Sequence, residues 1–203
     1  KCWSEGAGYS ATNCFEKDLE DARKVAEQLG VPFRIFDFEK EYKEKVMDYF
    51  FSEYEAGRTP NPDVECNREI KFGLFLDRAL KMGADYIATG HYVRRRQKSQ
   101  RSNASPCTQR GTGVNGQLFQ LLKGVDQKKD QSYFLWTLGQ KELSNSLFPI
   151  GDFKKEEVRE KAKNLGMPTF DKPDSQGICF VGEVDIQEFL KENIGTNPGP
   201  ILN

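Results

Sequence analysis

The sequence has no CxxC pair, no long apolar run and no signal-peptide pattern, and each absence argues against a class of protein. Its five cysteines are odd in number and lie far apart, so neither a disulfide framework nor a zinc ribbon is expected. No stretch of 18 apolar residues occurs, and we expect no membrane partner. The first residues lack a leader pattern and an initiator Met, which favours a cytoplasmic location and a truncated N-terminus.

Neither sign of charge dominates the chain. Its 203 residues hold 30 basic and 31 acidic side chains, so any contact with RNA has to be local. Residues 94–116 depart from this balance, with six basic side chains and no acidic one. Because this segment has almost no aliphatic side chains, we expect a solvated hairpin tip at about 97–116 rather than an added RNA contact.

Hydrophobic spacing predicts two modules of different character. In the first 123 residues, helical spacing alternates with short apolar runs typical of buried strands. The helices are expected at 13–29, 39–55 and 67–80, the strands at 33–38, 84–89, near Tyr92 and at 117–122. After Gly124 only short helices are expected, at 131–138, 140–147, 154–165 and 185–193. We therefore predict an α/β domain over 1–123 and a mostly helical domain over 124–203.

A proline-rich loop carries the first candidate site. Residues 57–66 read GRTPNPDVEC, which places Asp63 three residues before Cys66 at the expected start of a helix. Unpaired N–H groups at a helix start lower the pKa of a thiol there and make it reactive. The alternative is that Cys66 is a small buried residue and that Asp63 or Asn67 caps the helix.

Three further segments hold candidate residues, each with a structural alternative. Cys179 lies between glycines in DSQGICFVGE and, taken alone, is typical of a buried structural cysteine. His91, the one histidine, follows Gly90 at the carboxyl end of an expected strand, where ligands bind in open α/β sheets. A lone histidine is more often structural. Lys129, Asp130 and Gln131 crowd a predicted helix start and could bind phosphate and ribose, or Asp130 could be only a cap.

Four segments together resemble, in order and spacing, the signatures of the bacterial and mitochondrial tRNA 2-thiouridylases. They read GRTPNPDVECNREIKF, ADYIATGHY, LLKGVD followed by KDQSYFL, and DSQGICFVGE. The resemblance implies a Rossmann-like parallel sheet (HUP-type, adenine nucleotide alpha hydrolase-like) with an SGGxDS loop for ATP. A central helical tRNA-binding domain and β-barrel modules follow in that family.

The chain holds no SGGxDS motif. Lys1–Ser4 matches the segment after the family's second strand, and Asn203 falls before the β-barrel part. We therefore expect a catalytic domain that is truncated at its N-terminus, and a 203-residue chain that is inactive by itself.

The resemblance also implies a mechanism, the ATP-dependent 2-thiolation of the wobble uridine of tRNA. The C2 oxygen is adenylated and a cysteine persulfide supplies the sulfur. Cys179 would carry the persulfide, Cys66 would be the nucleophile that forms a Cys66–Cys179 disulfide, and Asp63 would be the general acid/base. Asn61 and Pro62 would shape the pocket of the target base with Asp63.

The remaining roles follow from the same resemblance. Gly90 would let ATP approach the backbone, and tRNA would be bound by His91, Lys129, Asp130 and Gln131. Mg²⁺ is expected with ATP, although its ligands are not identifiable, and the sulfur would come from a cysteine desulfurase or a sulfur-relay protein. The expected tRNAs have Lys, Glu and Gln anticodons.

Two other functions stay open. One is an enzyme of the same fold that adenylates a carboxylate or an amide. The other is an RNA-binding remnant without activity.

Overall fold

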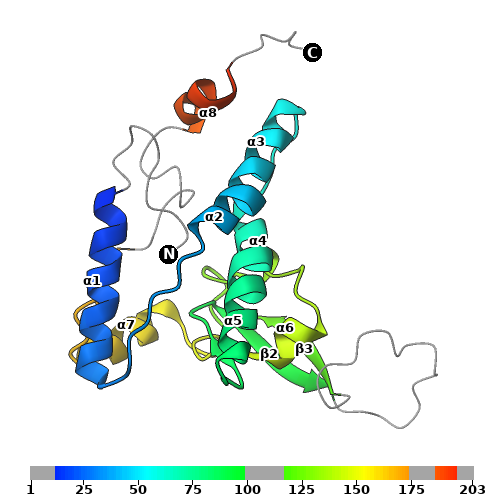
Figure 1. The fold of residues 1–203 in the computed structure, drawn as a ribbon. Helices are drawn as coiled ribbons and strands as arrows, with labels where there is room; N and C mark the ends of the chain where they lie inside the picture. Colours follow the sequence, from blue (N-terminus) through cyan, green and yellow to red (C-terminus); the bar gives the residue numbers. More distant parts are fainter. Residues whose placement is uncertain (1–11, 99–116, 174–185, 196–203) are drawn as a thin grey trace, which may run out of the picture. The chain divides into compact units, whose positions relative to one another are not determined.

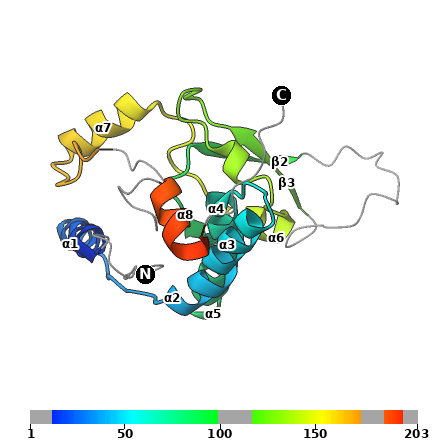
Figure 2. The same cartoon turned by 90° about the horizontal axis from the view of Figure 1, so that it is seen from above.

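The structure is a computed structural model that describes residues 12–98, 117–173 and 186–195 (Figure 1; a second view in Figure 2). The chain divides into two compact units, one formed by Lys1–Asp63 with Lys172–Asn203 and the other by Val64–Asp171. The domain boundary predicted between residues 123 and 124 falls inside the second unit and stays a prediction. None of the helices in the described part of the chain combines the length and apolar character that a bilayer-spanning segment needs.

The first unit is helical. Helix α1, Thr12–Leu29, ends at Gly30, whose φ of 64° supplies the left-handed conformation that closes many helices. Residues 39–55 form α2 (Glu39–Tyr42), a π-helical turn η1 (Lys43–Met47) and α3 (Asp48–Glu55), as the spacing predicts. Helix α8, Ile186–Ile194, packs against α3 (Figure 2). The rings of Phe51 and Phe189 stack there with their centroids 5.8 Å apart.

The strand predicted at 33–38 is wrong. Residues 31–38 have no regular secondary structure, and Val31, Phe33 and Ile35 are exposed. A strand exists only when a neighbour accepts and donates its backbone hydrogen bonds, and no strand among the described residues pairs with this segment. The short aromatic and β-branched run was therefore not sufficient to form a strand.

A continuous helical run begins with the last two residues of the first unit's N-terminal segment and continues into the second unit. It consists of α4 (Pro62–Glu65), the π-helix η2 (Cys66–Phe75) and α5 (Leu76–Lys81), and it ends before Gly83, whose φ is 90°. The prediction placed the start of this helix at Asn67, five residues too late. Pro62 suits the first helical position because that residue's N–H has no partner within the helix.

Two small sheets take the place of the expected Rossmann-like sheet. Strand β1, Ile87–Ala88, pairs in parallel with β4, Ser146–Leu147, and this is the one parallel pair in the described part of the chain. Strands β2 (Val93–Lys98) and β3 (Leu118–Lys123) form the predicted antiparallel hairpin. An extended parallel sheet is thus not formed by these residues, because the pair β1–β4 has no further strand beside it.

The segment after Gly124 is less helical than predicted. Only the short 3-10 helix η5 (Ser132–Phe134) forms within 131–138, and the predicted helix 140–147 is α6 (Gln140–Ser144) followed by β4. Helix α7, Lys155–Asn164, agrees with the prediction. The core of this unit combines side chains from all of these elements: Phe72, Leu76, Ile87, Val93, Leu135, Leu143 and Phe148.

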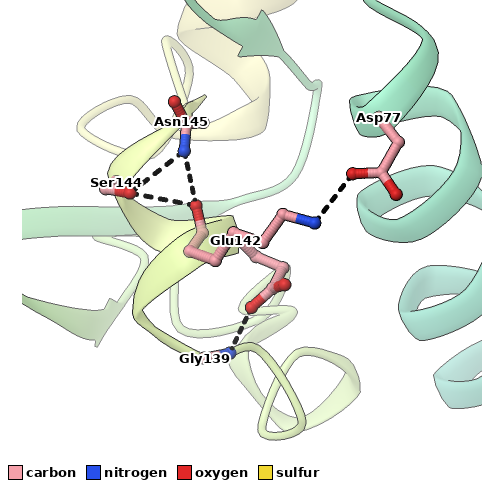
Figure 3. A network of polar contacts seen from close by, with 6 residues as sticks. Asp77, Gly139, Glu142, Ser144 and Asn145 are labelled. Carbon is pink, nitrogen blue, oxygen red and sulfur yellow. Dashed lines mark hydrogen bonds and ion pairs between the residues drawn. The ribbon is translucent and has the colours of Figure 1, made fainter. Parts of the chain in front are cut away.

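Polar contacts fix α6 at both ends (Figure 3). The Glu142 carboxylate accepts a hydrogen bond from the Gly139 N–H at the helix start, and Lys141 reaches Asp77 on α5 at 2.8 Å. At the other end, Arg95 of β2 donates to the carbonyls of Leu143 and Ser144 at 2.8 and 2.9 Å. Arg95 thereby satisfies the carbonyl groups that a helix leaves unpaired at its C-terminus.

Candidate functional site

Cys66 lies inside a helix and not in front of one. Because the helical run starts at Pro62, Asn61 occupies the N-cap position, which asparagine suits. The amides at the helix start precede the thiol by a full turn, and the helix field falls off within that first turn. The helix-start argument for a reactive Cys66 is therefore wrong, and the prediction of its role depends on the family resemblance.

The backbone around Cys66 is unusual in another way. Cys66 is the first residue of the ten-residue π-helix η2, a rare conformation that is frequent at functional sites. Its side chain is buried, at 7% exposure, and the preceding Glu65 is paired with Arg68 at 2.6 Å. Gly73 is required by this geometry, because a Cβ there would lie 2.8 Å from the Arg68 carbonyl oxygen.

Asn67 connects the Cys66 helix to the segment that follows Gln131. Its side chain is 2% exposed and its Nδ2 donates to the Phe134 carbonyl at 3.4 Å, a long hydrogen bond, while its Oδ1 has no partner among the described residues. The sequence suggested Asn67 only as a helix cap. Nothing in the local pattern signals a contact with a residue 67 positions away.

His91 is buried and tied to its own loop. Its Nδ1 lies 2.9 Å from the Thr89 hydroxyl, and its ring lies 5.6 Å from that of Phe72. Burial, with a smaller effect of the Lys71 charge, lowers the pKa of His91 from 6.5 to about 4. The imidazole is therefore neutral near pH 7 and can accept or donate a hydrogen bond, but it brings no positive charge.

Neither the backbone conformation nor the packing of the protein requires a glycine at position 90. Gly90 is exposed, its φ is not in the left-handed region, and an added Cβ would meet only Ile150 Cδ1, at 4.0 Å. By contrast, Cβ atoms at Gly124 and Gly151 would lie 2.5 and 1.8 Å from backbone oxygens of Tyr92 and Val93. The glycine at position 90 leaves backbone open to the outside of the protein.

Two of the four residues predicted to contact tRNA, Asp130 and Gln131, use their polar groups inside the protein. Gln131 makes two hydrogen bonds to the backbone of Tyr92. Its side-chain Oε1 accepts from the Tyr92 N–H at 2.9 Å, and its backbone N–H donates to the Tyr92 carbonyl. The Asp130 carboxylate accepts hydrogen bonds from the N–H groups of Gly124 and Ser132 and from the Ser132 hydroxyl. Asp130 therefore accepts backbone hydrogen bonds, as a capping residue does, but the segment it stabilises is a turn and not the start of the predicted helix.

Asp126, like Asp130, accepts hydrogen bonds from backbone N–H groups and so stabilises the turn that begins at Asp126. Its carboxylate accepts from the N–H groups of Lys155 at 3.0 Å and of Lys128 at 3.0 Å. These bonds, the one from Lys155 first, lower the pKa of Asp126. Lys129, whose N–H donates to the Asp126 carbonyl, is thus carried by an ordered turn.

The structure brings three of the four predicted segments together in the second unit. Tyr92, next to His91, bonds to Gln131, and Asn67, next to Cys66, bonds to Phe134. Asp63 belongs to the first unit, and Cys179 lies outside the described residues, so the Cys66–Cys179 pairing stays a prediction. Among the residues that the structure describes, no three His, Cys, Asp or Glu side chains form a group that could hold a metal ion.

Comparison with known proteins first gives the class of domain. The family model described as the tRNA methyl transferase HUP domain matches residues 1–183, so the chain contains a HUP domain, of the adenine nucleotide alpha hydrolase-like class. The chain belongs to the tRNA-specific 2-thiouridylase family, as its four motifs indicated.

The relatives match 92% to 100% of the chain. A protein of Flavobacterium johnsoniae called tRNA-specific 2-thiouridylase MnmA is 47% identical over 204 residues, which cover 100% of this chain and 48% of that protein. Proteins of the same name from Acidovorax ebreus and Bacillus velezensis are 50% and 47% identical over 92% of this chain and 46% of their own length. The chain thus spans about half the length of the curated relatives it matches.

Proposed function

We propose that this chain is the part of an ATP-dependent tRNA-uridine 2-sulfurtransferase that carries both catalytic cysteines. The product would be 2-thiouridine at the wobble position of tRNA. One observation supports this most strongly: Cys66, His91 and the 129–134 segment, all from the family signatures, are joined by hydrogen bonds between their neighbouring residues. The relatives that carry the printed name are 47% to 50% identical to this chain over 92% to 100% of its length.

The cysteines and Asp63 divide the chemistry. ATP, when bound, supplies the adenylate that makes the C2 oxygen of uridine a good leaving group. Cys179 would hold the sulfur as a persulfide, and attack of the Cys66 thiolate on the Cys179 sulfur would release the terminal sulfur as hydrosulfide and form the Cys66–Cys179 disulfide. The hydrosulfide would attack C2 of the uridine, and AMP would leave with the former C2 oxygen. A thiol reductant then restores both cysteines. Asp63 would move the proton at the target base, in the pocket shaped by Asn61 and Pro62.

The nucleotide would lie against the exposed backbone at Gly90. Position 90 has room because no described side chain fills the space that a Cβ would occupy. Mg²⁺ would accompany ATP. We propose further that β1 and β4 belong to a larger parallel, Rossmann-like sheet whose other strands lie outside the described residues.

Binding of tRNA would use the turn from Lys128 to Gln131 and His91. Since Asp130 and Gln131 bond to the protein's own backbone, we propose that they position Lys129, which would contact phosphate directly. The neutral His91 would contribute a hydrogen bond. The whole protein would act in the cytoplasm on tRNAs with Lys, Glu and Gln anticodons, with sulfur from a desulfurase or relay protein.

The test uses the full-length protein with ATP, a persulfide donor and tRNA. Wild type should form 2-thiouridine, whereas Cys66→Ser and Cys179→Ser should each abolish it. Cys107→Ser, outside the family motifs, is the matched control and should leave thiolation unchanged. Thiolation that is indifferent to Cys66 and Cys179 would refute the proposal and favour another adenylated substrate. We also expect the 203-residue chain alone to form no 2-thiouridine.

A further inference from the structure

Trp136 is exposed to a degree that is unusual for tryptophan. Its side chain is 73% exposed, the highest value among the large apolar side chains of the described residues, and Tyr133 three positions earlier is 60% exposed. Tryptophan is highly buried on average, so this exposed indole is a candidate for a contact with a binding partner.

The exposure does not come from a loose loop. Leu135, the preceding residue, is fully buried in the core of the second unit, and Leu138 also packs against that core. The Leu135 N–H donates to the Ser132 carbonyl at 3.1 Å, and the Leu138 N–H donates to the Leu135 carbonyl at 3.2 Å. Trp136 is therefore carried by a backbone that is anchored on both sides.

The polar surroundings indicate which kind of partner fits. Lys128 and Lys129 lie in the turn just before this segment, and Asp130, the acid beside them, uses both of its carboxylate oxygens in hydrogen bonds within the turn. Aromatic side chains beside cations are the combination that binds single-stranded nucleic acid, because bases stack on the rings while cations meet phosphates.

We propose that Trp136 stacks on an unpaired nucleobase of the RNA substrate, with Lys128 and Lys129 at the adjoining phosphates. This inference rests on the proposed function for the identity of the RNA. It adds a binding residue outside the Lys129–Gln131 segment and a chemistry, base stacking, that none of those three side chains can supply. The ring is available for it, and its anchored backbone reduces the entropy lost on binding.

The experiment measures tRNA binding by the full-length protein with Trp136→Phe, Trp136→Leu and Trp136→Ala. Loss of one base stack corresponds to a decrease in affinity of about 5- to 150-fold. We expect that decrease for Ala and Leu, and near wild-type affinity for Phe, which keeps a planar ring. Leu165→Ala, which removes an apolar side chain that is 65% exposed elsewhere in the same unit, should have no effect. Thermal melting confirms that all variants fold.

A second ligand separates stacking from other causes. A fully paired RNA duplex offers no unpaired base, so its binding should be the same for wild type and all Trp136 variants. Equal affinity of all variants for tRNA would overturn the inference, as would a Leu variant that binds as well as the Phe variant, which would indicate an apolar contact without stacking. Failure of wild type to bind tRNA would instead refute the proposed function itself.

Discussion

Replacing His91 by a residue that cannot be protonated should make the protein less sensitive to acid. The folded state holds this imidazole with a pKa of about 4, against 6.5 for the exposed side chain. Between these two values the unfolded chain binds more protons than the folded one. Stability therefore falls as pH decreases from about 6.5 to 4, and it is fully regained above pH 6.5.

The size of the effect follows from the two pKa values. At about 1.4 kcal/mol for each tenfold change in proton affinity, the complete loss is about 3 kcal/mol, of which about 2 kcal/mol is lost by pH 5. In a chain of this size, the loss of about 2 kcal/mol by pH 5 corresponds to a melting temperature lower by about 4 to 8 °C. The side chain is only 8% exposed, so solvent screening does not reduce this figure much.

The assay is thermal or urea unfolding of wild type and His91→Gln at pH 7 and pH 5. Each protein serves as its own reference, so a constant destabilisation of the variant cancels. Wild type should lose about 2 kcal/mol more than the variant between the two pH values. Equal losses in the two proteins would refute the argument that His91 is buried in its neutral form.

Three further predictions concern stability. Gly151→Ala should lower the melting temperature sharply, because its Cβ would lie 1.8 Å from a backbone oxygen of β2, whereas Gly90→Ala should leave it unchanged. Equal melting temperatures would contradict this. Arg95→Gln should cost about 2 to 4 kcal/mol in urea unfolding, through two charged hydrogen bonds to α6, while the exposed Arg96→Gln should stay within about 0.5 kcal/mol. Asp130→Ala should cost about 1 to 3 kcal/mol, because two backbone N–H groups lose their acceptor; an unchanged urea midpoint would show that water replaces the carboxylate.

Local signals predicted the elements that need no distant partner. The helices over 12–29, 39–55 and 155–164 and the hairpin of β2 and β3 follow from spacing and from glycines such as Gly30. A helix satisfies its own backbone hydrogen bonds, and a hairpin pairs neighbouring segments. The motifs around Cys66, His91, Asp130 and Cys179 were enough to predict the family.

What the sequence by itself determined is therefore the family, most helices and the residue types of the site. Only the tertiary structure decided that residues 31–38 lack a strand partner, that β4 pairs with β1, and that Gln131 bonds to Tyr92 and is followed by a short 3-10 helix in place of the predicted helix over 131–138. These outcomes depend on hydrogen bonds between groups far apart in the chain, and a pattern of neighbouring residues cannot contain them. For the same reason only the structure shows that Trp136, whose neighbour Leu135 is buried, is itself exposed.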